Sequence, residues 1–594
     1  MKFPTLITPK VSRDMIDVFK GYNHNLRIGD GEFYDMKNLS SADYPVLSPR
    51  SVRGVYAEAI HEVSDPGSPT GTTIIFPPSG MIAKDTLCYV DGTDFVMGEY
   101  RVPMGLSIAT QKTLVSMGAY VIIMPDKKYI NTADITDYGS IEATVTTAST
   151  VTFELCKNDG TGYEGAATGP TAPTDPQNMD LWIDTSSTPH VLKQYSATND
   201  MWVSVATTYI KISATGIGLP FSENDGVTIS GVESAALADL NSTMVIWARG
   251  DDYIVVTGIL NQSTTQDAAI TISRRMPNMD FIIESENRLW GCRYGTALNG
   301  EVVNEIYASK LGDFKNWNVF AGISTDSYVA TVGTDGQFTG AITHLGYPLF
   351  FKETCMHKVY GSYPANYQIQ TTACRGVQKG SEKSLAIVNE VLYYKARSGV
   401  CAYDGSLPVE MSAALGDVVY GNAVAGALGN KYYISMQDMN DVYHLFVYDT
   451  LKGMWHREDN TRALAFCTCR GELYYTEYGS NKIKTVMGSG APDTTPVSWM
   501  AETGIIGTDS PDKKYISRLD VRMSLDLGAT VMFFVQYDSL GEWEPLHTMT
   551  GTTLRSFPVS IRPKRCDHLR IRMVGEGEAK IFSICKSVEQ GSDV

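Results

Sequence analysis

The chain has 594 residues, a formal net charge of −17 and ten cysteines, and these properties exclude several classes of protein. The length predicts about three to five domains, because single hydrophobic cores rarely grow beyond about 300 residues. The acidic balance argues against tight nucleic-acid binding through a basic surface and against docking on anionic lipid. The cysteines are dispersed and form no CxxC, which predicts free thiols and no disulfide framework.

Residues 1–51 are predicted to form an N-terminal arm. The first ten residues, MKFPTLITPK, lack the apolar run of a secretory signal, and no run reaches the length that spans a bilayer. We therefore expect a soluble protein that is made in the cytoplasm and has no membrane anchor.

The stretch GDGEFYDMKNLSSADYPVLSPR (29–50) is polar and rich in turn residues. Asp30 can cap a short helical turn, followed by an extended stretch whose prolines oppose a helix. We predict an ordered strap, neither a strand nor a disordered leader, that lies over its own fold or reaches a neighbouring subunit. Its expected apolar anchors are Phe33, Met36 and Leu39, at a spacing of three, and then Tyr44 and Leu47.

A repeated phrase predicts an all-β fold with a β-propeller at its centre. The phrase is an apolar pair, one or two turn residues and a dense aromatic-aliphatic strand, as in LVSMGAYVIIMPDKKYIN (114–131). The last four dense strands are separated by about 40 residues, the period of four-stranded propeller blades. We expect six or seven blades, divided between residues 52–139 and 276–490. The other instances lie at 87–98, 281–295, 342–361, 385–405, 423–436 and 464–479.

The break in this period predicts an inserted β-domain at residues 140–275, since about 150 residues are far too many for an ordinary connection. A small module, residues 169–207, is nested within it and carries Trp182, Tyr195 and Trp202. Aromatic side chains on short hairpins can stack on sugar rings or on a partner protein. They can equally form the core of a domain too small to find another.

The C-terminal residues 491–594 predict a β-sandwich, because their strands alternate polar and apolar residues. A basic cluster lies near the end of this domain. It could contact DNA phosphates or an acidic neighbouring subunit, or it could be a solvated sheet face. Its members are Arg562, Lys564, Arg565, Arg570 and Arg572.

The sequence contains no recognisable catalytic signature. HExxH, GxSxG, GxGxxG and EF-hand patterns are absent. GVQKGSEKS (376–384) has the wrong spacing for a phosphate loop and is better explained as a hairpin turn. No pair of histidines has the spacing of metal ligands. We therefore expect no enzymatic activity, no cofactor and no metal site.

Several phrases resemble structural proteins of tailed bacteriophages. Besides the stretch 29–50, they include RRMPNMDFIIESENRLWGCRYG, TDGQFTGAITHLGYPLFFKE and YDTLKGMWHRED. The nested module, with DLW-x-D, then LK-x-Y and then Trp, resembles a module of phage tail and fibre proteins. The nearest architecture is the tail nozzle of short-tailed phages, in which a propeller-bearing subunit assembles, usually as six copies, into a tube below the portal and adaptor.

This resemblance implies a structural protein of the virion tail. We expect a ring, most simply a hexamer, that contacts portal, adaptor, tail or fibre proteins and conducts DNA through its lumen without binding it specifically. An acidic lumen would repel phosphates, and a propeller leaves few free sheet edges. One alternative is a tail protein that binds a host receptor or glycan through the inserted domain. Another is a hydrolase on a propeller scaffold.

Overall fold

The computed structural model describes residues 11–60, 62–64, 73–75, 77–108, 111–297, 300–507, 513–551 and 553–590. Residues 1–10 of the predicted arm lie outside them. The described chain is almost entirely β-structure, which confirms the predicted fold class. Within these residues, no helix is long and apolar enough to cross a membrane.

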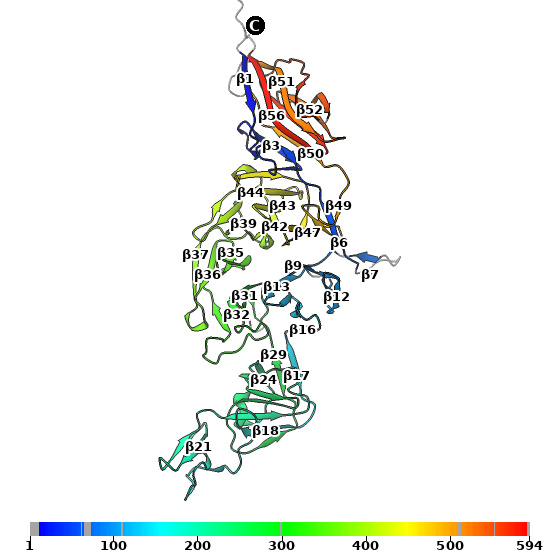
Figure 1. Cartoon of the computed structure of the whole chain (residues 1–594). Helices are drawn as coiled ribbons and strands as arrows, with labels where there is room; N and C mark the ends of the chain where they lie inside the picture. Colours follow the sequence, from blue (N-terminus) through cyan, green and yellow to red (C-terminus); the bar gives the residue numbers. More distant parts are fainter. Residues whose placement is uncertain are drawn as a thin grey trace, which may run out of the picture.

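Figure 1 shows an elongated molecule with a β-propeller in the middle, an inserted β-domain at one end and a C-terminal β-sandwich at the other. Seven sheets of the described chain form the propeller, and we number them blades 1 to 7 in chain order. Most of the repeated phrases form the first hairpin of a blade, with the dense strand second. The short loops of two such hairpins place Gly118 and Gly429 at a φ of 55°, where glycine is favoured.

The blade strands are the following. Blade 1 has β9 (Met81–Ala83), β10 (Leu87–Asp91), β11 (Asp94–Met97) and β12 (Tyr100–Pro103). Blade 2 has β13 (Thr113–Met117), β14 (Tyr120–Met124), β15 (Lys128–Asn131) and β16 (Tyr138–Ser140). Blade 3 has β30 (Phe281–Ser285), β31 (Arg288–Thr296), β32 (Val302–Ala308) and β33 (Tyr328–Thr331). Blade 4 has β34 (Gly340–His344), β35 (Tyr347–Lys352), β36 (Cys355–Tyr360) and β37 (Gln368–Ala373).

Blade 5 has β38 (Ala386–Val388), β39 (Val391–Lys395), β40 (Val400–Tyr403) and β41 (Val409–Glu410). Blade 6 has β42 (Gly421–Leu428), β43 (Lys431–Gln437), β44 (Tyr443–Asp449) and β45 (Met454–Arg457). Blade 7 has β46 (Ala463–Cys469), β47 (Glu472–Glu477) and β48 (Lys482–Thr485), and then β6 (Gly54–Glu58) with β49 (Ala491–Pro492). Short 3-10 helices in the propeller are η2 (Pro364–Asn366), η3 (Glu382–Ser384) and η4 (Ala413–Leu415).

The propeller closes into a ring through the first strands of its blades. Each first strand contacts the next from β9 through β13 and β30 to β34, and from β38 through β42 and β46 back to β9; between blades 4 and 5 the contact is made by η3, which touches β34 and β39. Closure depends on β6, which comes from the N-terminal part of the chain and pairs with β48. The short hairpin of β7 (Glu62–Ser64) and β8 (Thr73–Ile75) follows β6.

The inserted domain lies between β16 and β30 and has two sheets around its own apolar core. One sheet contains β17 (Ala143–Thr146), β29 (Thr271–Arg274), β24 (Gly226–Ser230) and β25 (Thr243–Val245). The other contains β26 (Ala248–Gly250), β27 (Tyr253–Thr257), β23 (Tyr209–Ser213), β18 (Val151–Cys156) and β28 (Thr264–Gln266), and η1 (Ala235–Leu240) packs beside them. The first and last strands, β17 and β29, pair with each other where the chain enters and leaves.

The nested module is a four-stranded sheet between β18 and β23, and we define it as residues 167–204. Its strands are β19 (Ala167–Gly169), β20 (Leu181–Asp184), β21 (Val191–Ser196) and β22 (Met201–Ser204). Cys156 and Tyr209, on either side of the module, face each other in the β18–β23 pair. The module therefore replaces what would otherwise be a hairpin turn.

The C-terminal sandwich consists of a four-stranded sheet facing part of a ten-stranded one. The first contains β1 (Val11–Ile16), β56 (Ala579–Gln590), β51 (Lys514–Leu525) and β54 (Arg555–Val559). The second continues blade 6 through β2 (Gly21–Tyr22) and β3 (Glu32–Lys37) into β50 (Ser498–Thr503), β55 (Leu569–Glu576), β52 (Thr530–Tyr537) and β53 (Glu544–Thr550). The small pair β4 (Leu39–Ser40) and β5 (Ser48–Pro49) lies beside them.

The helical turn predicted after Asp30 is wrong, because residues 32–37 form strand β3. This strand pairs with β50 on one side and β2 on the other. A bulge between Phe33 and Asp35 adds one residue to the strand, so Phe33 and Met36 are both buried despite their odd spacing. The spacing of three that suggested a helix is therefore produced by a strand with a bulge.

Candidate functional site

The three aromatic residues of the nested module pack on one another. Trp182 is only 6% exposed, and its Nε1 donates a hydrogen bond to the Gly169 carbonyl at 3.0 Å. The Trp202 ring lies 5.5 Å from Trp182 and 5.4 Å from Tyr195, measured between centroids. These side chains form the core of a module that has little other apolar material, and they do not present an open platform for a sugar ring.

The predicted basic cluster is divided into two groups. Arg570 and Arg572 on β55 both bind the buried carboxylate of Glu502, at 3.2 and 2.7 Å. Their guanidinium groups also lie over the rings of Tyr34 and Trp543.

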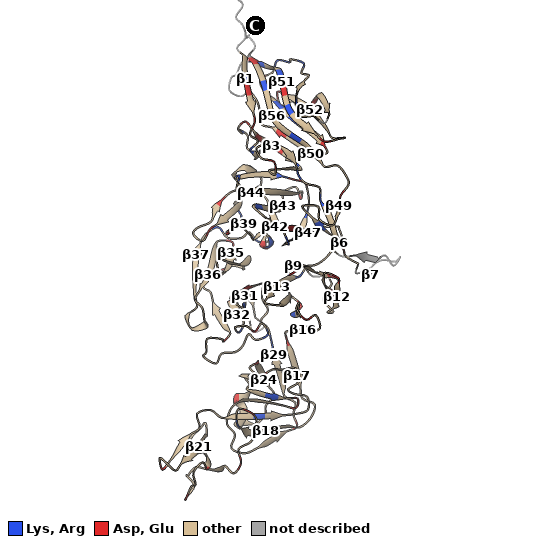
Figure 2. Ribbon diagram, viewed as in Figure 1, with Lys and Arg blue, Asp and Glu red and all other residues tan. Residues whose placement is uncertain are grey.

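The second basic group lies in the loop before β55. Lys564 pairs with Glu544 at 2.8 Å, while Arg562 and Arg565 are exposed. Figure 2 shows acidic and basic residues interspersed over the sandwich strands. Neighbouring carboxylates therefore neutralise much of the positive charge that the Lys and Arg side chains of the sandwich would present to a phosphate.

Four of the five predicted arm anchors are buried, but Tyr44 is not. Phe33, Met36, Leu39 and Leu47 belong to one core that blades 5 and 6 share with the sandwich. Tyr44 is 38% exposed, and its ring lies under the Lys452 ammonium. The chain turns outward between β4 and β5, so the tyrosine at this turn faces the solvent side.

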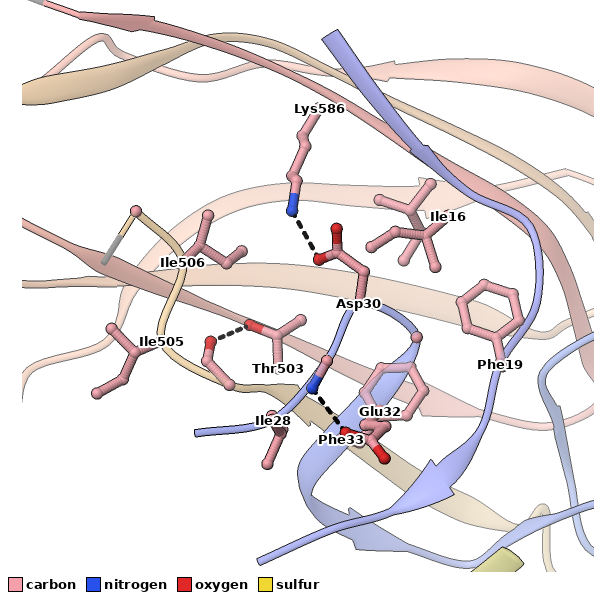
Figure 3. Close-up of a pocket in the computed structure, with 15 residues that line it drawn as sticks. Ile16, Phe19, Ile28, Asp30, Glu32, Phe33, Thr503, Ile505, Ile506 and Lys586 are labelled. Carbon is pink, nitrogen blue, oxygen red and sulfur yellow. Dashed lines mark hydrogen bonds and ion pairs between the residues drawn. The ribbon is translucent and has the colours of Figure 1, made fainter. Parts of the chain in front are cut away.

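A small cavity of about 160 Å³ lies where the arm meets the sandwich. Figure 3 shows the Asp30 carboxylate facing Lys586, at 2.8 Å, among isoleucines of the arm and of residues 505–506. Asp30 therefore forms an ion pair with β56 instead of capping a helix. The neighbouring Glu32 carboxylate accepts a hydrogen bond from the Gly29 N–H at 2.6 Å. These contacts fasten the arm to the sandwich.

A largely buried ionic network, which sequence reasoning missed, fastens the end of the arm and the residues just after it to blade 6. The Arg53 guanidinium binds Glu458 and Asp459, both at 2.8 Å, and Arg50 lies within 3.8 Å of the same carboxylates. Burial alone would raise the pKa of Asp459, but the charges of Arg53 and Arg50 and the hydrogen bonds from Thr461 together outweigh it and hold the pKa below its ordinary value. The partners are some 400 residues apart in sequence, so no local pattern marks them.

An apolar groove of about 570 Å³ lies on the propeller rim between the outer edges of blades 3 and 4. Phe320 and Ile323 reach it from the loop between β32 and β33, Val329 from β33 and Tyr363 from the connection between β36 and β37. We call this surface the rim groove. These four side chains are 43–57% exposed, although burying large apolar side chains normally stabilises a protein.

The loop that forms the rim groove is held rigidly by buried polar contacts. The Arg288 guanidinium donates hydrogen bonds to the carbonyls of Ser309, Ser324 and Asp326. The Asp326 carboxylate accepts from the N–H groups of Gly322 and Ile323, at 2.6 and 3.1 Å. The exposed apolar residues are thus displayed on an ordered surface. No strand or helix period marks them in the sequence.

The described residues bring together no group of three or more His, Cys, Asp or Glu side chains that could hold a metal ion. All ten cysteines are free, and most of them are buried. Burial raises the pKa of the Cys88 and Cys467 thiols to about 12, so these two side chains stay protonated near neutral pH.

No protein-family model and no curated protein matches the sequence. Solved structures similar to the chain include an exo-β-1,3-galactanase from Phanerochaete chrysosporium with galactose. It is 10% identical with a TM-score of 0.20, covering 51% of this chain and 94% of the other. A sialidase from Trypanosoma rangeli in complex with sialic acid is 8% identical with a TM-score of 0.20, covering 91% of this chain and 95% of the other.

A glycoside hydrolase of family GH43 also matches, at 9% identity and a TM-score of 0.19 over 52% of this chain and 96% of the other. These matches contradict our expectation that the chain has no enzymatic activity, and we withdraw it. Our expectation rested only on missing sequence motifs, and a function resides in a particular site, which short motifs need not reveal. Matches this weak assign no activity, substrate or site residue to this chain.

Proposed function

We propose that this chain is a structural subunit of a bacteriophage tail, of the nozzle type, that assembles into a ring around a DNA passage. The rim groove carries the proposal. Large exposed apolar patches on a well-ordered surface mark interaction sites, and this one lies on the flank of an elongated, three-part subunit. Side-by-side contact at such a flank forms a ring and leaves both end domains free for other tail proteins.

The charge of the chain supports a DNA passage over a DNA-binding role. A net charge of −17 makes the molecule repel phosphates, and the paired cations on β55 leave little free positive charge there. The phrases that resemble phage tail proteins extend over most of the chain, which agrees with a single role for the whole molecule. We propose the hexamer as the ring, and the virion tail as its location.

The mass of the purified assembly tests this proposal. We expect a ring of about 390 kDa, six times the 65.1 kDa of one chain, because closed symmetry favours a defined number of subunits. Light scattering and electron microscopy of the same sample would measure the mass and show the ring. A chain that stays monomeric at its highest soluble concentration would contradict the proposal.

The surface that lines the passage provides a second test. We expect it to be neutral or net negative, so that DNA slides without being held. An electron microscopy map of the ring would show which residues face the lumen. A lumen lined by Arg562, Lys564 and Arg565 would contradict the electrostatic part of the proposal.

A further inference from the structure

Three polar side chains of the C-terminal sandwich form a continuous chain of hydrogen bonds. The Ser539 Oγ lies 2.7 Å from His568 Nε2, and His568 Nδ1 lies 2.9 Å from an oxygen of the Asp567 carboxylate. Ser539 belongs to the turn after β52, whereas Asp567 and His568 directly precede β55. A hydroxyl, an imidazole and a carboxylate in this order have the arrangement of a nucleophile, its base and the group that orients the base. We call these three residues the serine triad.

The carboxylate sets the state of the histidine ring. The hydrogen bond from His568 holds the pKa of Asp567 below its ordinary value, so this side chain is ionised near neutral pH and can only accept hydrogen bonds. His568 Nδ1 therefore carries the proton that is donated to Asp567, and Nε2 is left to accept the proton of the Ser539 hydroxyl. This is the tautomer that a general base for serine needs.

Backbone contacts hold the serine turn against the histidine. The Asp538 carboxylate accepts hydrogen bonds from the N–H groups of Asp567 and His568, at 2.7 and 3.3 Å. The Asp538 N–H in turn donates to the His568 carbonyl at 3.0 Å. Asp538 and Ser539 have φ angles of 53° and 54°, in the left-handed region, where residues other than glycine are strained and which is enriched at active sites. The backbone thus keeps the serine and the histidine within reach of each other.

The nucleophile is open to a substrate from outside. Ser539 is exposed and His568 is partly buried, while the side chain of the next residue, Leu540, is 71% exposed. An ester can reach the hydroxyl directly, and Leu540 offers an apolar contact to its acyl group. The Ser539 N–H donates to no other group of the described residues, so it is available to the oxygen on which negative charge develops.

We propose that the serine triad cleaves small carboxylic esters, an activity beyond the structural role proposed above. Ser539 Oγ attacks the carbonyl carbon of the ester while its proton passes to His568 Nε2. The bond from that carbon to the alcohol oxygen then breaks, and His568 returns the proton to the departing alcohol. Water next attacks the acyl group on Ser539 and gives a proton to His568. The carboxylic acid leaves as this proton returns to the serine oxygen.

A fluorophosphonate probe tests the nucleophile in the full-length wild-type chain. The serine oxygen attacks phosphorus, fluoride leaves and His568 takes the proton, so an activated serine reacts much faster than an ordinary hydroxyl. Ser556 on β54 is the control within the same molecule, because it is also exposed but contacts Arg522 Nε, at 3.4 Å, in place of a histidine. Peptide mass spectrometry should find Ser539 labelled at least about 100-fold faster than Ser556. Equal labelling of the two serines, or none, would overturn the inference.

Variants of the other two members test their roles. His568→Ala should slow the labelling of Ser539 by about 100-fold or more, because the hydroxyl loses its base. Asp567→Asn should slow it by about tenfold or more, since an amide can donate to Nδ1 and favour the wrong tautomer. The matched control is His547→Ala, at an exposed histidine of β53, which should be labelled like the wild-type chain. A folded His568→Ala variant that is labelled at the wild-type rate would refute the triad.

Hydrolysis of p-nitrophenyl acetate tests the complete reaction. The wild-type chain should release p-nitrophenol over many turnovers, and Ser539→Ala should abolish the release. If this variant does not fold, Ser539→Gly replaces it, because glycine adopts a positive φ without strain. A wild-type chain that is no faster than the folded serine variant would overturn the esterase assignment. None of these readouts depends on assembly, so an inactive chain that still forms a ring would refute this inference alone.

Discussion

The N-terminal arm, residues 11–51, and the nested module, residues 167–204, are similar in sequence and opposite in structure. Both are polar and rich in turn residues. The strands of the arm pair with β45, β50 and β56, hundreds of residues away. The strands of the module pair only with each other. Position in the fold, and not local composition, decides how much of the molecule depends on a segment.

The difference arises from where the apolar side chains go. The arm buries its residues in the core that joins blades 5 and 6 to the sandwich, and it carries the ten-stranded sheet from the propeller into the C-terminal domain. The module buries Trp182 against its own Trp202. Loss of the arm should therefore destabilise most of the chain, whereas loss of the module should affect only the strands beside it.

Deletion of each segment should show the largest effect. Removing residues 1–50 is expected to give no soluble folded protein, because the loss of β1 to β5 leaves their partner strands unpaired and the shared core open. Replacing residues 158–207 by an Asn-Gly turn should give a folded protein, since Cys156 and Tyr209 already face each other as a hairpin pair. Soluble yield and circular dichroism measure both. A folded, ring-forming arm deletion would show that the arm is dispensable.

Substitution of one aromatic residue in each segment should show the same contrast with a smaller effect on stability. Phe33→Ala is expected to destabilise the sandwich and blade 6 by about 3–5 kcal/mol, the usual cost of emptying a buried phenylalanine site. Trp202→Ala should increase hydrogen exchange within residues 167–204 and leave the rest unchanged. Urea denaturation and hydrogen exchange with mass spectrometry provide the measurements. Increased exchange across the propeller in Trp202→Ala would contradict the independence of the module.

The ionic contacts that hold the two segments should differ in the same direction, and those of the arm centre on Arg53, two residues after it. Arg53→Met leaves Glu458 and Asp459 buried with only the more distant Arg50, and we expect a loss of about 3 kcal/mol. Lys193→Met removes the partner of Asp184 in the module and should cost less, with effects confined to that sheet. Denaturant midpoints of the two variants make the comparison. Equal losses would mean that the Arg53 network is not the stronger attachment.

Acid should loosen the arm's sheet before it loosens the module. Burial lowers the pKa of His456, on β45, to about 3. Below its ordinary value of about 6.5, the unfolded chain binds a proton that the folded chain does not, so stability falls by up to about 1.4 kcal/mol per pH unit as pH decreases toward 3.

The module responds to acid in a lower pH range. Its Asp184 has a pKa of about 2 because of hydrogen bonds from Lys193 and Ser186. The stability that the ionised Asp184 side chain contributes is fully present above pH 3.8 and is lost only as the pH falls through about 2. Hydrogen exchange at pH 7 and pH 5, corrected for intrinsic rates, should show the change around β45 and around His357 on β36, whose pKa burial lowers to about 4, and no change in the module. His456→Phe should reduce the loss around β45 at pH 5, and an unchanged loss there would remove His456 as its source.

Sequence patterns predicted the all-β class and the hairpins because both depend on residues within a few positions of each other. The dense strand after a Gly or Asn turn is such a local signal, and β31, β35, β39, β43 and β47 follow it. The rim groove had no comparable signal, since Phe320 and Ile323 lie in a loop without periodicity. The prediction of a helical turn after Asp30 is wrong, because the bulge in β3 gives the buried apolar residues the spacing that is typical of a helix.

By itself, the sequence determined the class of fold, its repeated hairpin and the acidity of the surface, all of which follow from composition and short-range alternation. Only the tertiary structure decided that the arm is part of the largest sheet, that Arg53 meets Glu458, and that the module's aromatics face inward. These outcomes depend on contacts between residues hundreds of positions apart. Such contacts form when the propeller closes and its strands acquire neighbours, and they leave no trace in a local pattern.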